Sequence, residues 1–148
     1  ATRAKAFEAA AALEDGASEI DMTLPVGKWL DGDAGAVERD ISAVVQALQG
    51  GALVKVILET AYFTPEQIAG ACAIAEAAGA DFVQTSTGYG PGGAKADDVR
   101  LMRAAVSDKI GVKAAGGIRD AEAARRLLEA GACRIGTSFA MAVAGGEG

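Results

Sequence analysis

The sequence lacks histidine altogether and has only two cysteines, three prolines and one tryptophan in 148 residues. Without histidine, the chain can hold neither a Ser-His-Asp triad nor a His-ligated metal. Two distant cysteines, Cys72 and Cys133, are too few for a disulfide scaffold or a clustered zinc site.

Basic charge and long apolar runs are also missing. Lysine and arginine total 14 against 20 acidic residues, a net charge of -6, so no nucleic-acid partner is expected. No run approaches the roughly 18 apolar residues of a membrane span. The first residues also lack the apolar core of a signal peptide. We therefore expect no membrane partner and a cytoplasmic location.

Aliphatic residues and glycine are plentiful. Hydrophobic residues make up 51% of the chain and charged residues 23%, a balance typical of a globular protein with a real core. The length predicts one domain over residues 1–148. An alanine-rich stretch ends at Gly-Ala before an apolar segment at Gly16, Gly79 and Gly131. Glycine can end a helix in the left-handed conformation, so this repeated motif predicts a helix that ends at the glycine and is followed by a strand.

Helix and strand signals alternate along the chain. Helices are expected near residues 3–15, 34–49, 65–78, 96–107 and 120–130. Strands are expected near residues 18–24, 53–59, 81–86, 110–115 and 133–137. Strict alternation with five strands predicts an α/β fold with a parallel sheet.

Polar residues interrupt these strands in a regular way. A parallel strand covered on both faces should be nearly all apolar, yet four strands carry a central polar residue: Asp21, Lys55, Gln84 and Lys113. Side chains alternate faces along a strand, so these residues can share one face, and Glu59 can join Lys55 there. A barrel interior can hold a polar site near its open end, whereas helices cover both faces of a doubly wound sheet. We favour the barrel; structural ion pairs or a misjudged strand phase are the alternatives.

Glycines and hydroxyls follow the last two expected strands. They are Gly116 and Gly117 after the first of these strands, and Gly136, Thr137 and Ser138 after the second. Glycine lets backbone N–H groups approach a phosphate, and the loops after the last barrel strands are a frequent phosphate site. Two tight turns are the alternative. The polar, glycine-rich stretch 85–93 is expected to contact substrate or to act as a lid.

Seven segments carry a resemblance to a known family. They are residues 19–22 (EIDM), 53–60 (LVKVILET), 80–83 (ADFV), 85–88 (TSTG), 92–93 (GG), 112–119 (VKAAGGIR) and 134–138 (RIGTS). In this order they resemble the deoxyribose-phosphate aldolases over nearly the whole chain. The resemblance implies a (β/α)8 barrel of the TIM type. It also implies a lyase without metal or other cofactor, which cleaves 2-deoxyribose 5-phosphate reversibly to glyceraldehyde 3-phosphate and acetaldehyde through a lysine Schiff base.

The resemblance also implies roles for individual residues. Asp21 matches the proton-relay aspartate, and Lys113 matches the second lysine, which lowers the pKa of the Schiff-base lysine. The segments that bind the sugar and its phosphate contribute Thr87, Gly88, Gly116, Gly117, Gly136, Thr137 and Ser138.

Two departures from the family pattern bear on function. Gln84 stands where the Schiff-base lysine belongs, and a primary amide cannot form an iminium. Gln84 is either a substitution introduced to trap a bound substrate or the mark of a natural pseudoenzyme. The chain also matches five of eight barrel strands, as expected of a fragment or of a short form.

We therefore expect an aldolase with an impaired Schiff-base step, acting on a small phosphorylated sugar or aldehyde. The alternative is a non-catalytic phospho-metabolite-binding or assembly module of the same fold. A third possibility is that Lys113 or Lys55 takes over as the amine. Five barrel strands leave two unpaired edges, so a homo-oligomer or association with the missing barrel segment is expected.

Overall fold

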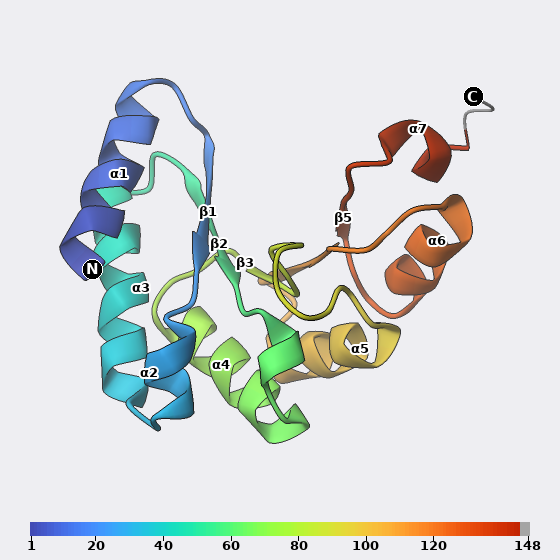
Figure 1. Ribbon diagram of the computed structural model, residues 1–148. Coiled ribbons are helices and arrows are strands. Elements are labelled where there is room, and N and C mark those ends of the chain that lie inside the picture. Colours follow the sequence, from blue (N-terminus) through green and yellow to red (C-terminus); the bar gives the residue numbers. More distant parts are fainter. Residues whose placement is uncertain (146–148) are drawn as a thin grey trace.

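Parallel strands alternate with helices in the computed structural model, which describes residues 1–145 (Figure 1). The strands are β1 (Glu19–Thr23), β2 (Leu53–Ile57), β3 (Phe82–Gln84), β4 (Gly111–Ala115) and β5 (Arg134–Gly136). The helices are α1 (Thr2–Glu14), α2 (Val26–Leu30), α3 (Ala34–Leu48), α4 (Pro65–Ala77), α5 (Ala96–Ala105), α6 (Ala121–Glu129) and α7 (Ala140–Val143), with the 3-10 turn η1 (Thr60–Tyr62). The strands pair in chain order, β1-β2-β3-β4-β5, so the expected parallel α/β sheet is confirmed.

The helix boundaries follow the local signals in the sequence. Gly16, Gly79 and Gly131 all have positive φ, between 92° and 114°, directly after α1, α4 and α6. Helix α4 begins with a capping box in which Thr64 and Gln67 each bond the backbone of the other. These contacts satisfy N–H groups that a helix start otherwise leaves unpaired.

The short elements α2, η1 and α7 were not predicted. Helix α2 has five residues, too few to show a helical repeat in the sequence. It is held by Trp29, whose indole N–H donates to the Gln67 carbonyl at 3.1 Å. A side chain at Gly70 would meet the Trp29 ring at 3.0 Å, so α4 leaves space for the indole. Strand β2 also ends at Ile57 rather than at residue 59.

The sheet is strongly curved. Strands β1 and β5 lie at opposite edges, and four steps between strands of a flat sheet would separate them by roughly 19 Å. Yet Arg134 on β5 contacts Glu19 on β1 at 2.5 Å, which only a rolled sheet allows. The helices form an arc on the outer side, from α1 and α3 beside β1 to α6 and α7 beyond β5 (Figure 1). This is the geometry of part of a barrel.

The core lies between the outer face of the sheet and this arc of helices. Val54, Val56, Val83 and Val112 are at most 2% exposed, as expected for the helix-covered face. Ile20 is only partly buried, because it lies on the edge strand. Among residues 1–145, no helix combines the length and the apolar character that crossing a membrane would need.

Candidate active site

A chain of ion pairs crosses the inner face of the sheet. One carboxylate oxygen of Asp21 accepts from Lys55 Nζ at 2.8 Å, and the other accepts from Lys113 Nζ at 2.8 Å. Lys55 also contacts Glu19 at 2.6 Å, and Glu19 continues to Arg134. Lys55 is buried, whereas the Lys113 side chain is 19% exposed. The residues expected on one face therefore meet, and they do so as ion pairs.

These contacts set the charges of the inner face. Burial opposes the charge of Asp21, but hydrogen bonds from Lys113 and Lys55 outweigh it and lower the pKa of Asp21. Burial likewise opposes the charge of Lys55, but Asp21 and Glu19 outweigh it and raise the pKa of Lys55. Hydrogen bonds from Arg134 and then Lys55 lower the pKa of Glu19 to about 2. At neutral pH both carboxylates are charged and Lys55 is protonated.

Gln84 lies directly beside Lys113 in the register of β3 and β4 and is 4% exposed. Its Nε2 donates to the Ser86 carbonyl at 2.9 Å. Because a carbonyl oxygen only accepts, this contact fixes the orientation of the amide. Within residues 1–145, the Gln84 Oε1 atom is buried without a hydrogen-bond partner. Leaving such an oxygen without a partner costs about 1–3 kcal/mol.

The ends of β4 and β5 enclose a hollow of about 250 Å³, which we call the glycine pocket. It is lined by Thr87, Ala115, Gly116, Gly117, Ile118, Gly136, Thr137, Ser138 and Phe139. The φ angles of Gly116 and Gly117 are +93° and +73°, which glycine adopts without strain. Six of the seven residues expected to bind the sugar and its phosphate therefore lie together, and Gly88 lies outside the lining.

Glu59 was expected to share the polar face of the strand with Lys55, but β2 ends at Ile57, before Glu59. It lies beyond the end of β2 in the left-handed conformation, with φ +63° and ψ +60°, which costs a non-glycine residue of order 1–3 kcal/mol. Its carboxylate accepts from the backbone N–H and the hydroxyl of Thr87. The only signal in the sequence was a charged residue next to an apolar strand.

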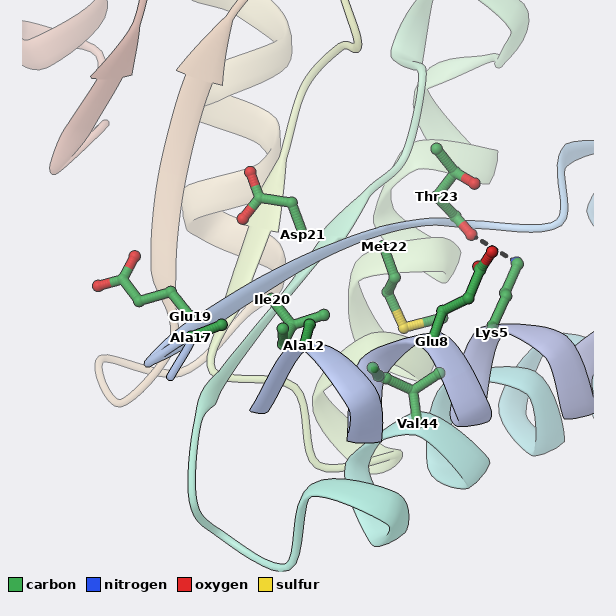
Figure 2. Close-up of a pocket in the computed structure, with 11 residues that line it drawn as sticks. Lys5, Glu8, Ala12, Ala17, Glu19, Ile20, Asp21, Met22, Thr23 and Val44 are labelled. Carbon is green, nitrogen blue, oxygen red and sulfur yellow. Dashed lines mark hydrogen bonds between the residues drawn. The ribbon is translucent and has the colours of Figure 1, made fainter. Parts of the chain in front are cut away.

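A larger cavity, of about 520 Å³, lies between α1 and β1 (Figure 2). Ile20 and Met22 point toward the helices, whereas Glu19 and Asp21 point to the opposite side of β1. The cavity lies beside β1, the unpaired edge strand of the sheet. Glu19 and Asp21, which belong to the polar inner face, lie at its border. Within the described part of the chain, no cluster of three or more His, Cys, Asp or Glu side chains is placed to hold a metal ion.

Comparison with known proteins agrees with this geometry. Residues 2–145 match the family model described as DeoC/LacD family aldolase. The deoxyribose-phosphate aldolase of Thermococcus gammatolerans is 56% identical over 146 residues, which cover 98% of this chain and 65% of that protein. The one of Listeria innocua is 53% identical over 143 residues, 97% of this chain and 64% of that protein. The chain thus spans just under two thirds of the length of these relatives.

Solved structures show the same fold. A protein titled "QR15, an Aldolase" matches with a TM-score of 0.92 at 39% identity, over 98% of this chain and 65% of that one. A tetrameric deoxyribose phosphate aldolase from Aeropyrum pernix matches with a TM-score of 0.86 at 36% identity, over 97% of this chain and 60% of that one. From its curved sheet, its polar inner face and these matches, the chain belongs to the DeoC/LacD aldolase family.

Proposed function

We propose that this chain is a deoxyribose-phosphate aldolase whose Schiff-base step is impaired by Gln84. One observation carries the proposal: Lys113, paired to Asp21 at 2.8 Å, lies in register beside Gln84 rather than beside a lysine. In this proposal Lys113 is the accessory lysine and Asp21 the proton-relay carboxylate, and Gln84 brings an amide where the nucleophile would stand. The names of the relatives supply the substrate class, 2-deoxyribose 5-phosphate.

The proposed chemistry needs a neutral amine. In the aldolase reaction, a lysine nitrogen bonds to C1 of the open-chain sugar and water leaves, which forms an iminium. The C2–C3 bond then breaks, its electrons move into the iminium to give an enamine, and the C3 hydroxyl proton passes to a base. Asp21 is the residue of the inner face suited to orient the water that carries this proton. The enamine is finally protonated and hydrolysed, which releases acetaldehyde and restores the lysine.

Neither lysine of the inner face is a good replacement for the missing amine. The buried ammonium of Lys55 contacts both Glu19 and Asp21, and the raised pKa of Lys55 keeps it protonated. Lys113 donates to Asp21. An amine must lose its proton and reach the carbonyl carbon, and errors of about an ångström already cost much of the rate.

The glycine pocket is the proposed site for the phosphate group. Backbone N–H groups at Gly116 and Gly117 and the hydroxyl of Ser138 can donate to an anion there. A phosphate site here supports the second candidate function as well, a non-catalytic module that binds a phosphorylated metabolite.

Ser138→Asp should abolish phosphate binding in calorimetry, because it brings a negative charge to the pocket. Ser18→Asp, at an exposed position just before β1 and outside the lining of the pocket, should leave binding unchanged.

Borohydride reduction in the presence of 2-deoxyribose 5-phosphate, followed by intact mass and peptide mapping, tests the function. We expect no stable adduct with this chain and an adduct at position 84 in the Gln84→Lys variant. A label on Lys55 or Lys113 in both proteins would contradict the assignment of Gln84 as the missing nucleophile. If neither protein is labelled but phosphate stabilises both, the binding module is the better description.

We also propose that the chain associates with a second copy or with a segment that completes the barrel. The Ser18 carbonyl and the Leu24 N–H both form hydrogen bonds with β2, so the backbone N–H and C=O groups of even-numbered β1 residues point toward β2. The backbone groups of odd-numbered residues point to the open edge, where the Thr23 carbonyl accepts from Lys5 Nζ at 2.8 Å. Unpaired edges and the adjoining apolar cavity favour a partner. The tetrameric relative from Aeropyrum pernix supports a homo-oligomer.

A further inference from the structure

The loop between β3 and α5, residues 85–95, reaches the glycine pocket through Thr87 and is anchored by a residue from another strand end. That residue is Glu59, which is 7% exposed. Both oxygens of its carboxylate accept from the Thr87 backbone N–H, at 3.2 and 3.4 Å, and one also accepts from the Thr87 hydroxyl. Among residues 1–145, no lysine or arginine forms an ion pair with Glu59. Its buried charge is therefore compensated by Thr87.

The direction of these hydrogen bonds decides what Thr87 can offer a ligand. The Thr87 hydroxyl donates its proton to Glu59 and accepts from the backbone N–H of Tyr89 at 3.1 Å. A carboxylate only accepts, so this order cannot reverse while Glu59 is ionised. The hydroxyl proton of Thr87 is then not available to an anion in the pocket. Glu59 thus acts through Thr87, by fixing its rotamer and the turn that follows.

Close packing holds the rest of the loop in the same place. A Cβ atom at Gly90 would lie 2.7 Å from the Glu59 carboxyl carbon, so the loop wraps directly over the carboxylate. Further along, Gly93 packs against the Gly116 carbonyl, and the Ala94 N–H donates to that carbonyl at 3.0 Å. The loop is therefore fixed at two points, one at Glu59 and one at the glycine turn that lines the pocket.

The backbone of Glu59 is strained, and strain of this kind persists where surrounding contacts enforce it, often at functional sites. Gln49 is the other non-glycine residue with positive φ in the described chain, at +49°. It ends α3 at an exposed position, where a left-handed residue is an ordinary helix stop. Glu59 ends no helix, and its strained conformation places a buried carboxylate under Thr87.

We propose that Glu59 is a positioning residue that holds the β3–α5 loop over the glycine pocket and so sets the affinity of the pocket for a phosphate monoester. This inference rests on the proposed function for the identity of the ligand. The hydrogen bonds and the packing of the loop do not depend on that function, so the two can be tested apart.

The sharpest variant is Glu59→Gly, with Gln49→Gly as its matched control. Both remove a side chain at a positive φ, so both relieve backbone strain. Gln49→Gly should keep the melting temperature, whereas Glu59→Gly also loses the hydrogen bonds to Thr87 and should lower it. Only Glu59→Gly removes the carboxylate from Thr87. Although the Thr87 hydroxyl is then free to donate, we expect Glu59→Gly to weaken the binding of 2-deoxyribose 5-phosphate about tenfold in calorimetry, because the loop is no longer ordered before the ligand binds. Gln49→Gly should leave the affinity unchanged.

Amide hydrogen exchange gives a readout that needs no ligand. In Glu59→Gly, the Thr87 and Tyr89 amides should exchange faster than in the parent chain, whereas they should not in Gln49→Gly. Gly90→Ala, which crowds the carboxylate without removing it, should have the same effect as Glu59→Gly. If Thr87 keeps its protection in both loop variants, or if affinity falls equally in Gln49→Gly, the proposal is wrong. If the parent chain binds no phosphate ester while Thr87 loses protection, the positioning role holds and the proposed function fails.

Discussion

At the scale of the residue, one amide decides how the inner face can react. Gln84 has nearly the volume of a lysine stem and occupies a site next to Lys113, but it brings neither charge nor a nucleophile. Its Oε1 atom is buried, and within residues 1–145 it has no hydrogen-bond partner.

The role of Lys113 can therefore be tested only after an amine is present. The amine introduced by Gln84→Lys would lie beside Lys113, and two such charges disfavour double protonation. The pKa of the new amine should therefore lie below that of an isolated lysine. Lys113→Leu in this background should shift the retro-aldol rate to higher pH, measured as acetaldehyde release. Lys113→Leu with Gln84 kept should change little, and an unshifted pH profile in the double variant would contradict the pairing.

At the scale of the element, α1 depends on contacts outside itself. It is rich in alanine and has no side-chain cap, and among residues 2–14 only Ala9 is buried. Asp40 of α3, 4% exposed, holds it by accepting from Thr2 Oγ1 and from Lys5 Nζ, both at 2.6 Å. Lys5 also reaches the edge of β1, so one buried carboxylate connects two helices and a strand.

Asp40→Ala should therefore loosen α1 before the rest of the molecule. We expect a loss of about 1–3 kcal/mol, as for hydrogen bonds to a charged group. Amide exchange should become faster across α1 and stay slow in β2 and β3. Arg126→Ala, which removes the exposed ion pair with Glu122 at 2.8 Å, is the control and should cost only about 0.3–0.5 kcal/mol. Equal losses in the two variants would show that α1 is not held by Asp40.

At the scale of the whole molecule, the inner ion pairs and the buried thiol set the pH range of stability. The lowered pKa values of Glu19 and Asp21 mean that their stabilisation is present above their unfolded values. It is lost as pH falls, for Glu19 between about 4.5 and about 2. The raised pKa of Lys55 stabilises the fold below 10.5, and this contribution is lost as pH rises further. Burial raises the pKa of the Cys72 thiol from 9.0 to about 12, so thiolate formation favours unfolding in that range.

Urea unfolding measured from pH 2 to pH 11 should therefore give a plateau with a loss of stability on both sides. Glu19→Gln should lower the free energy of unfolding at pH 7 and have a much smaller effect at pH 2, because about half of the parent carboxylate is then protonated as well. On the acid side, the free energy of unfolding of this variant should therefore fall less steeply with pH than that of the parent. An identical acid limb in the two proteins would show that the contact between Glu19 and Arg134 does not contribute.

Association is the second property of the whole molecule. Sedimentation equilibrium at micromolar concentration should show a species larger than one chain, because β1 and β5 both present unpaired edges. Ile20→Lys, at the cavity beside β1, should reduce the apparent mass, whereas Leu128→Lys on exposed α6 should not. A compact and cooperatively unfolding monomer would contradict the proposed association.

The order of the elements, the polar inner face and the glycine turns all followed from the sequence alone. The end of a helix at Gly79 depends only on neighbouring residues, and so does the alternation that puts Lys55 and Val56 on opposite faces of a strand. Both can therefore be predicted from a short stretch of sequence. The short helix α2 could not, because it depends on a tryptophan that packs against a distant helix.

The tertiary structure decided which of the polar residues meet. Glu19 and Arg134 are 115 residues apart, and they form a contact only because the sheet curls until its first and last strands face each other. Glu59 was expected on the strand with Lys55, but the strand ends before it and a left-handed turn carries its carboxylate to Thr87. Curvature and strained turns depend on how all the strands pack together, and no local pattern of residues encodes them.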